Sequence, residues 1–408
     1  MKRIFSCFLL GAGCFLIPAT ILAQSTSTNL SGQPLRVPNS AVPFLNFTPD
    51  ARSGALGDAG VALDNADANS IFWNPSKLVY ARQNAGAAVS YTPWLRDLIG
   101  DMYYGYFSGY KKLGKDQAIG LSLLYFDLGT INFTTSQGLS AGSFNSREYA
   151  LSATYSRRLA KNFSMGVNLK YLNSNLGAGT FVNGTPIEAG STAAADISAY
   201  YNNTSRDAAT GKGVSWAYGL MISNLGGRIN YGSQELYYIP TNLRIGGLFT
   251  YHADTYNKFN FVLDLNKLMV PTPPIYGAPV AGGKPPIIGG QNPNRPYFSA
   301  VFGSFADAPA GVAEELKEIT LSTGAEYWYN DQFAARIGYF GESVEKGGRQ
   351  YVTAGIGARL ATLGVDFSYL LPVRSGSPLA NTLRLSLLFN FNKGQRVAED
   401  TETADKDN

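Results

Sequence analysis

The feature that most constrains this chain is a period-two alternation of apolar with small or polar residues, repeated in segments of about ten residues. From Phe163 to Tyr171, every odd position is apolar and every even position is small or polar. Successive side chains of a β-strand point to opposite faces, so this segment has one apolar and one polar face. The same alternation recurs at 147–157, 257–266, 363–370 and 382–391. It predicts strands that each bury one face in apolar surroundings.

Fourteen segments fit this description, and the connections between them alternate in length. Connections after the even-numbered segments are mostly short, with 202–213 as the one long exception, whereas those after the odd-numbered segments are longer, up to 267–317. Short turns at one end and long loops at the other are typical of outer-membrane barrels. We therefore predict an all-β fold, a transmembrane antiparallel β-barrel of about 14 strands over 83–391. The expected strands are 83–91, 101–110, 117–126, 147–157, 163–173, 192–201, 214–223, 242–251, 257–266, 318–329, 332–340, 350–360, 363–370 and 382–391.

A soluble β-sandwich also alternates apolar and polar residues, and it is the competing interpretation. Two observations favour the barrel. Only 15% of the residues are charged, against about 25% in ordinary globular domains. Aromatic residues also recur at segment ends, where their rings suit the two membrane interfaces. These residues are Tyr91, Tyr110, Phe126, Tyr171, Tyr201, Tyr251, Tyr329, Phe340 and Tyr369.

The N-terminus has the pattern of a secretory signal peptide over residues 1–23. Lys2 and Arg3 precede an apolar run, and Ala23 offers a small residue for cleavage. Small residues before Cys14 also allow a lipoprotein interpretation, but the apolar run continues past that cysteine. Cleavage after Ala23 lowers the formal charge from +4 to +2 by removing Lys2 and Arg3. A chain so close to neutral lacks the basic field that nucleic-acid binding needs, so we expect an exported protein with no nucleic-acid partner.

Composition also argues against enzymatic and cofactor chemistry. The chain has 1 histidine, and its 2 cysteines both precede the predicted cleavage site, so no multi-histidine or cysteine metal site is expected. His252 falls in a predicted short turn without a nucleophile assigned by any motif, and we interpret it as a solvated turn residue. We expect no enzyme activity, no catalytic residue, no metal and no cofactor.

Two segments flank the predicted barrel. Residues 24–82 contain a glycine-rich stretch from Asp50 to Ala62, and we expect a plug segment tucked into the periplasmic mouth, with its glycines packed against the wall. Asp50, Arg52 and Asp58 are candidates for ion pairs between plug and barrel. The acidic residues 392–408 are almost devoid of apolar side chains and predict a disordered tail. Two weak motifs are set aside: a calcium site at Asp64, Asp67 and Asn69, and a phosphate loop at Gly54, Gly57 and Gly60.

The longest connection, 267–317, predicts an external docking element. It holds 9 of the 20 prolines, which stiffen a protruding chain, and long ordered loops are often functional. We expect an exposed apolar patch there that binds a partner protein, although a loop folded back over the barrel mouth would show the same prolines. Trp94, at the first external turn, is either a further binding residue or an anchor in the membrane interface. The loop candidates are Leu268, Met269, Val270, Pro271, Pro273, Ile275 and Tyr276.

Several stretches resemble the PorV outer-membrane proteins of the type IX secretion system, which belong to the FadL-like superfamily of fatty-acid channels. The resemblance runs from about 40 to about 391, and the segments that carry it are Val42–Leu45, Asp50–Ala62, Ala68–Leu78, Ser90–Leu95 and Leu263–Tyr276. It implies a FadL-like barrel of fourteen strands in the cell outer membrane. It also implies a non-enzymatic role in protein secretion, with Trp94 and the loop candidates binding cargo or the translocon.

The partners that this resemblance implies are a large outer-membrane translocon barrel, the C-terminal signal domains of cargo proteins and a sortase-like attachment complex, besides membrane lipid. The protein would bind the signal domain of cargo that leaves the translocon and deliver it to the attachment complex. The alternative is a FadL-like channel for the uptake of hydrophobic small molecules. Apolar ligand density in the lumen would favour the channel, and cargo that co-purifies with the barrel would favour the secretion role.

Overall fold

The computed structural model describes residues 36–391, apart from 97, 135–137, 180, 183–184, 279–284 and 375–376. The predicted signal peptide 1–23 with its cleavage after Ala23, the alternative at Cys14 and the predicted tail 392–408 lie outside the described residues. Within them, no helix is long and apolar enough to cross a membrane.

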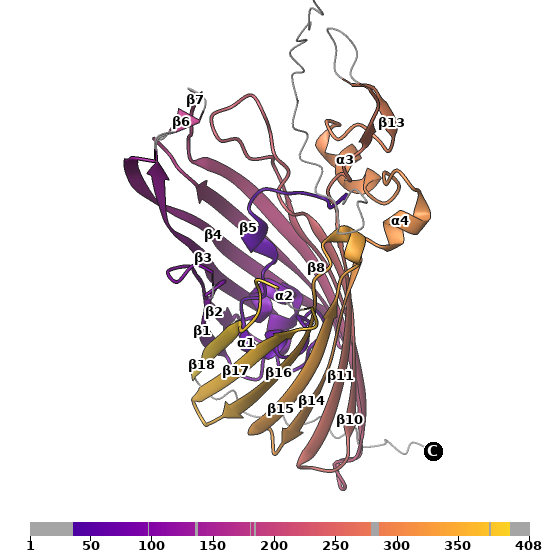
Figure 1. Ribbon diagram of the computed structural model, residues 1–408. Coiled ribbons are helices and arrows are strands. Elements are labelled where there is room, and N and C mark those ends of the chain that lie inside the picture. Colours follow the sequence, from indigo (N-terminus) through magenta and orange to yellow (C-terminus); the bar gives the residue numbers. More distant parts are fainter. Residues whose placement is uncertain are drawn as a thin grey trace, which may run out of the picture. The chain divides into compact units, whose positions relative to one another are not determined.

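Fourteen strands of the described chain form one closed antiparallel wall, in which β1 closes on β18 (Figure 1). Every predicted segment becomes one wall strand, so the predicted all-β barrel is confirmed. The wall strands are β1 (Ala85–Pro93), β2 (Tyr103–Lys112), β3 (Gln117–Thr134), β4 (Ser140–Ala160), β5 (Phe163–Asn175), β8 (Gly190–Arg206), β9 (Gly213–Gly226), β10 (Asn242–His252), β11 (Asn257–Leu268), β14 (Ile319–Tyr329), β15 (Phe333–Gly341), β16 (Gln350–Arg359), β17 (Leu363–Pro372) and β18 (Leu383–Phe391).

The alternation places apolar side chains outside the wall and polar ones inside it. In β5, Met165, Val167 and Leu169 are exposed on the outer face, while Ser164 and Asn168 are buried toward the lumen. A wall that is closed on itself pairs its backbone groups between strands, as the hydrocarbon core of a membrane requires. The alternation in the sequence therefore matches what a membrane barrel requires, an apolar outer face and a polar lumen.

The predicted aromatic rims are correct for some positions and wrong for others. Tyr91, Tyr171, Tyr201, Tyr251 and Tyr329 are exposed on the outer face. Tyr110, Phe126 and Phe340 are instead buried at lumen-facing positions: Tyr110 and Phe126 pack with residues that precede β1, and Phe340 packs with Tyr351 and Leu370. Tyr369 is half-buried.

The two ends of the barrel differ in the length of their connections. The short-turn end carries 113–116, 161–162, 207–212, 253–256, 330–332 and 360–362, and the long-loop end carries the remaining connections. The connection predicted to be long, 202–213, is short in the structure, because β8 and β9 extend into it. Asp207 Oδ1 accepts hydrogen bonds from the backbone N–H groups of Ala209 (2.9 Å) and Thr210 (2.7 Å), which close the turn tightly. We place the long-loop end outside the cell, as in other outer-membrane barrels.

Residues 36–84 lie within the wall, and we call them the plug. They contain η1 (Pro43–Asn46), α1 (Ala51–Gly54), α2 (Ser70–Trp73) and η2 (Pro75–Tyr80). At one end of the plug, the Ala41 N–H donates to the Tyr238 carbonyl in a long loop; at the other, Lys112 Nζ donates to the Ala81 carbonyl near a short turn. The plug thus runs the length of the lumen, and its predicted restriction to the periplasmic mouth is wrong. Polar lumen positions along the whole wall offer it hydrogen bonds.

The connection 269–318 folds into a small unit at the long-loop end, which we call the insert (Figure 1). It contains the hairpin β12 (Ile275–Tyr276) and β13 (Ile287–Gly289), followed by the short helices α3 (Tyr297–Gly303) and α4 (Val312–Leu316). A second small hairpin, β6 (Phe181–Val182) and β7 (Thr185–Pro186), belongs to the connection between β5 and β8, and the turn η3 (Val344–Lys346) to the connection between β15 and β16.

Candidate functional site

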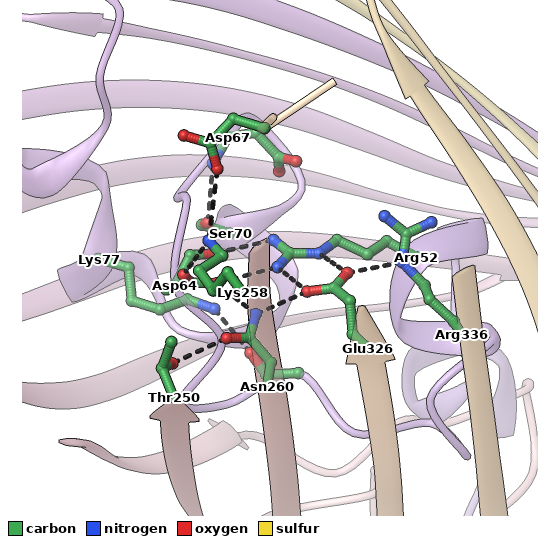
Figure 2. Close-up of polar contacts among 12 residues, drawn as sticks. Arg52, Asp64, Asp67, Ser70, Lys77, Thr250, Lys258, Asn260, Glu326 and Arg336 are labelled. Atoms are coloured by element: carbon green, nitrogen blue, oxygen red, sulfur yellow. Dashed lines mark hydrogen bonds and ion pairs between the residues drawn. The ribbon is translucent and has the colours of Figure 1, made fainter. Parts of the chain in front are cut away.

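The most densely charged part of the lumen joins the plug to the wall around Glu326 of β14 (Figure 2). Arg52 of α1 holds this carboxylate with two hydrogen bonds, from Nε to Oε2 (3.0 Å) and from Nη2 to Oε1 (2.8 Å). Arg336 of β15 donates Nε to the same Oε2 (2.6 Å) and Nη1 to Asp366 of β17 (2.8 Å). These side chains are buried, so each charge depends on its partner. We call Arg52, Glu326, Arg336 and Asp366 the latch.

Asp64 of the plug extends the latch toward β11. Its Oδ1 accepts from Arg52 Nη2 (3.1 Å) and its Oδ2 from Lys258 Nζ (2.9 Å). Asn260 bridges Asp64 and Glu326, donating to Oδ1 (3.2 Å) and Oε1 (2.8 Å) respectively. Burial alone would raise the pKa of Asp64, but the charges of Lys258 and Arg52 outweigh it and hold that pKa below its ordinary value. The Asp64 carboxylate is thus held between the cationic side chains of Arg52 and Lys258.

The three residues predicted to pair plug with barrel lie in different settings. Arg52 is central to the latch. Asp58 accepts a hydrogen bond from the hydroxyl of Tyr351 (2.5 Å) and lies 3.8 Å from Arg384 on β18. Asp50 hydrogen-bonds within the plug, where it caps α1 through the Ser53 N–H (2.8 Å) and accepts from Trp73 Nε1 (2.6 Å). The wall partners were missed, although a charged residue on the polar face of a predicted strand is a usable signal.

The plug backbone touches the wall at Gly57 and again at Gly60 and Val61. Gly57 has a φ of +68°, and a Cβ built there would lie 2.3 Å from the carbonyl oxygen of Tyr339. The N–H groups of Gly60 and Val61 both donate to Asp264 Oδ2 on β11, at 2.7 and 2.9 Å. The glycine-rich stretch therefore serves close packing against the wall.

Trp94 is not placed as either of its interpretations requires. It is buried and stacks on Phe47 of the plug with ring centroids 4.3 Å apart. Tyr104 and Phe126 complete this aromatic cluster. An anchor in the membrane interface would point outward, and a docking residue would be accessible. The cluster instead packs the plug against β2 and β3.

Buried ion pairs hold the base of the insert. Lys267 at the end of β11 donates Nζ to Glu315 (2.9 Å) and Glu318 (2.6 Å), and Lys346 donates Nζ to Glu314 (2.7 Å) and Glu318 (2.8 Å). Arg36 of the plug adds two hydrogen bonds to Glu314, at 3.0 and 3.1 Å. Burial opposes ionisation of Glu314, but the bonds from Arg36 and Lys346 outweigh it and lower its pKa to about 2. The insert is thus tied to the barrel and to the plug.

The predicted apolar patch of this loop is only partly exposed. Met269 and Val270 are buried, so their predicted exposure is wrong: Val270 packs in a cluster with Tyr238 and Ala300, and Leu268 lies half-buried against it. The sequence could not show that the loop returns over its own beginning. Pro271 is also buried and Pro273 half-buried, while Ile275 and Tyr276 are exposed.

The insert displays a different apolar set, which sequence analysis missed. Phe298 and Phe302 of α3 are 66% and 55% exposed, and Val312 and Leu316 of α4 are 75% and 63% exposed. Each pair is spaced by four residues, which places both members on one helix face. That spacing was the available signal. We call these four side chains the apolar face of the insert.

His252 has a partner that sequence analysis did not foresee. Its Nε2 lies 2.9 Å from Oγ of Ser215 on β9, so it is not the freely solvated turn residue that we expected. A serine activated in this way also needs a group that orients the histidine. Among the hydrogen bonds of the described residues, none joins a carboxylate to His252. The described residues likewise contain no group of three or more His, Cys, Asp or Glu side chains that could hold a metal ion.

A closed wall with an apolar outer face, a polar lumen and a plug drawn from the same chain defines an outer-membrane β-barrel. The family model described as "Type IX secretion system protein PorV" matches residues 31–275, and the chain belongs to that family. It is an outer-membrane component of type IX secretion.

Solved structures that match the chain in a structural comparison, at low sequence identity, include transporters. The Pseudomonas putida toluene transporter TodX is 12% identical over 82% of this chain and 95% of its own, with a TM-score of 0.45. The Ralstonia pickettii toluene transporter TbuX is 12% identical over 85% and 99%, with a TM-score of 0.44. A Pseudomonas aeruginosa FadL homologue is 11% identical over 85% and 99%, with a TM-score of 0.41. No curated protein matches the sequence significantly.

Proposed function

We propose that this barrel receives the C-terminal signal domain of cargo at its long-loop end and delivers it to a sortase-like attachment complex beside the translocon barrel. The apolar face of the insert carries this proposal. Its four large apolar side chains stand exposed on a unit that buried ion pairs hold in place. Large apolar side chains that stay exposed on a firmly held unit are typical of a protein-binding site.

The filled lumen supports a role at the surface. The backbone of the plug contacts β15 directly at Gly57, and Arg52 of the latch ties the plug to Glu326 on β14. A folded signal domain therefore has no path through this barrel while the plug is seated. The accessible elements at the outer end are the insert and the neighbouring long loops, where cargo would dock.

Replacing Phe298, Phe302, Val312 and Leu316 with serine tests the proposal. The detergent-extracted variant should retain less than about a tenth of the cargo signal domain that the unmodified barrel captures, because interface energy concentrates in a few large apolar anchors. Lys317→Ser, which breaks only the exposed pair with Glu345, is the matched control and should capture normally. Both variants should show the heat-dependent gel mobility of a folded barrel. Normal capture by the folded quadruple variant would contradict the proposal.

A channel for hydrophobic small molecules is the second candidate, and one cavity favours it. A cavity of about 900 Å³ near the long-loop end is lined by Val42, Pro43, Phe126, Leu128 and Tyr231, among others. Drug-sized ligands occupy cavities of this size and character. Leu128→Trp, which narrows the cavity, should slow the uptake of toluene into liposomes under this alternative and leave cargo capture unchanged. Uptake that is no faster than through protein-free liposomes would exclude the channel.

A further inference from the structure

A second cavity, of about 710 Å³, lies above the plug and is lined by five cationic and three anionic side chains. We call it the mouth cavity. Its lining includes Gly347, Gly348 and Ser377 from two long loops, so it is approached from the long-loop end. Trp73, Trp94, Phe47 and Leu95 give part of its wall an aromatic and apolar character.

The three carboxylates of the mouth cavity are engaged with other groups. Glu342 binds Arg349 through two hydrogen bonds, of 2.9 and 3.0 Å. Glu318 is held by Lys267, Lys346 and Thr272. Asp58 accepts from the Tyr351 hydroxyl, and its nearest cation is Arg384 at 3.8 Å, beyond hydrogen-bond distance.

Two arginines of the mouth cavity are only partly engaged. Arg244 of β10 and Arg384 of β18 are 4% and 3% exposed. Within the described residues, Nη1 of Arg244 and both Nε and Nη1 of Arg384 have no hydrogen-bond partner. Nη2 of Arg244 lies 3.5 Å from Oδ1 of Asn46, at the limit for such a bond. Its guanidinium also lies over the rings of Phe72 and Trp73, each at 5.1 Å, a contact that leaves its in-plane donors free.

A guanidinium whose N–H donors are only partly paired is expensive to bury, because the remaining donors lose water without a replacement. Two such guanidinium groups that line one cavity can donate hydrogen bonds to a bound acceptor, and guanidinium geometry matches a planar carboxylate. The aromatic wall would accommodate an apolar body attached to that carboxylate. We propose that the mouth cavity binds an organic carboxylate with an apolar or aromatic body, held by Arg244 and Arg384.

Such a carboxylate has two sources, a free organic acid or the C-terminus of a polypeptide. The site is independent of the proposed docking on the insert, since neither arginine belongs to it. Normal cargo capture by the insert variant would therefore contradict only the docking proposal. Absence of carboxylate binding in the mouth cavity would contradict only the present one.

The test measures binding to the purified full-length barrel in amphipol by calorimetry. 3-Phenylpropionate and its uncharged amide form one pair of probes, and a pentapeptide ending in phenylalanine, with a free or an amidated C-terminus, forms the other. The charged member of at least one pair should bind at least about tenfold more tightly than its neutral analogue. The pair that shows this difference identifies the source of the carboxylate.

Arg244→Gln and Arg384→Gln should each abolish the difference between charged and neutral probes. Arg82→Gln, which removes an exposed arginine at the short-turn end, should keep it. Asp58→Asn guards against variants that fail to fold: it removes the negative charge beside Arg384, and asparagine tolerates the φ of +63° at this position. The Asp58→Asn variant should bind the charged probe more tightly than the unmodified barrel. The proposal would be overturned if the unmodified barrel bound charged and neutral probes equally, or if neither the unmodified barrel nor Asp58→Asn showed saturable binding.

Discussion

At the scale of residues, buried charges fix the plug. Glu326 receives two arginines, one from the plug and one from the wall, and removal of Glu326 would leave both buried cations with one carboxylate partner fewer. Breaking a buried pair in this way is far more costly than losing an exposed one. Individual pairings of this kind were not predictable from sequence, because alternation shows which residues face the lumen but not which plug residue meets them.

Glu326→Gln tests the latch. The substitution leaves Arg52 and Arg336 facing a neutral amide, so the free energy of unfolding in guanidinium should fall by about 3–5 kcal/mol. Arg82→Gln, which breaks the exposed pair with Asp331, should cost below about 1 kcal/mol. A cost for Glu326→Gln as small as that of the control would show that the latch does not hold the plug.

Gly57→Ala tests the close approach of plug and wall. The new Cβ would require both an unfavourable positive φ and displacement of the Tyr339 backbone. Gly114→Ala is the matched control, because Gly114 also has a positive φ, of +90°, but a Cβ added there would meet nothing within 4 Å. The control should lose about 1–2 kcal/mol of stability from φ alone, and Gly57→Ala clearly more. Equal losses of stability in the two variants would mean that the plug backbone can move away from Tyr339 without a cost.

At the scale of elements, strands were predictable and their contacts were not. The fourteen segments were found because period two is local. The lengths of β3, β4 and β8 were underestimated, because these strands continue past the predicted bounds as paired ribbons. The insert shows the limit more sharply. Met269 and Val270 are apolar residues in a long loop, and only the tertiary fold reveals that Tyr238 and Ala300 pack with Val270.

The attachment of the insert should depend on pH through Glu314. Its pKa falls from the ordinary 4.5 to about 2, so the stabilisation is complete above about 4.5 and disappears as the pH falls toward 2. Fluorescence anisotropy of a dye attached through Val312→Cys should stay constant from pH 8 to 5 and then drop. In a background carrying Glu314→Gln, anisotropy should be lower at neutral pH and lack most of that drop. A transition near pH 6 would contradict this assignment.

At the scale of the whole molecule, the plug occupies the lumen, and the proposed function therefore places the work of the barrel at its outer end. The alternation in sequence builds the wall, the glycine-rich segment fills it, and the insert carries the accessible apolar surface. The channel alternative differs in one physical respect, because small molecules cross the lumen only when the plug moves. Whether function survives an immobile plug therefore separates the two functions.

A disulfide between Val61→Cys in the plug and Gly246→Cys in β10 tests this most directly. A Cβ built on Gly246 lies 3.0 Å from the Cβ of Val61 and 2.3 Å from Oδ1 of Asp264, so the Asp264 side chain must turn aside. With that change, a small backbone shift reaches the roughly 3.5–4.5 Å between Cβ atoms that a disulfide spans. The only other cysteines of the chain are Cys7 and Cys14, in the predicted signal peptide. The oxidised, locked barrel should attach cargo to the cell surface at the same level as the reduced form. Attachment that is lost on oxidation and restored by reductant would contradict a sealed barrel that works at its outer end.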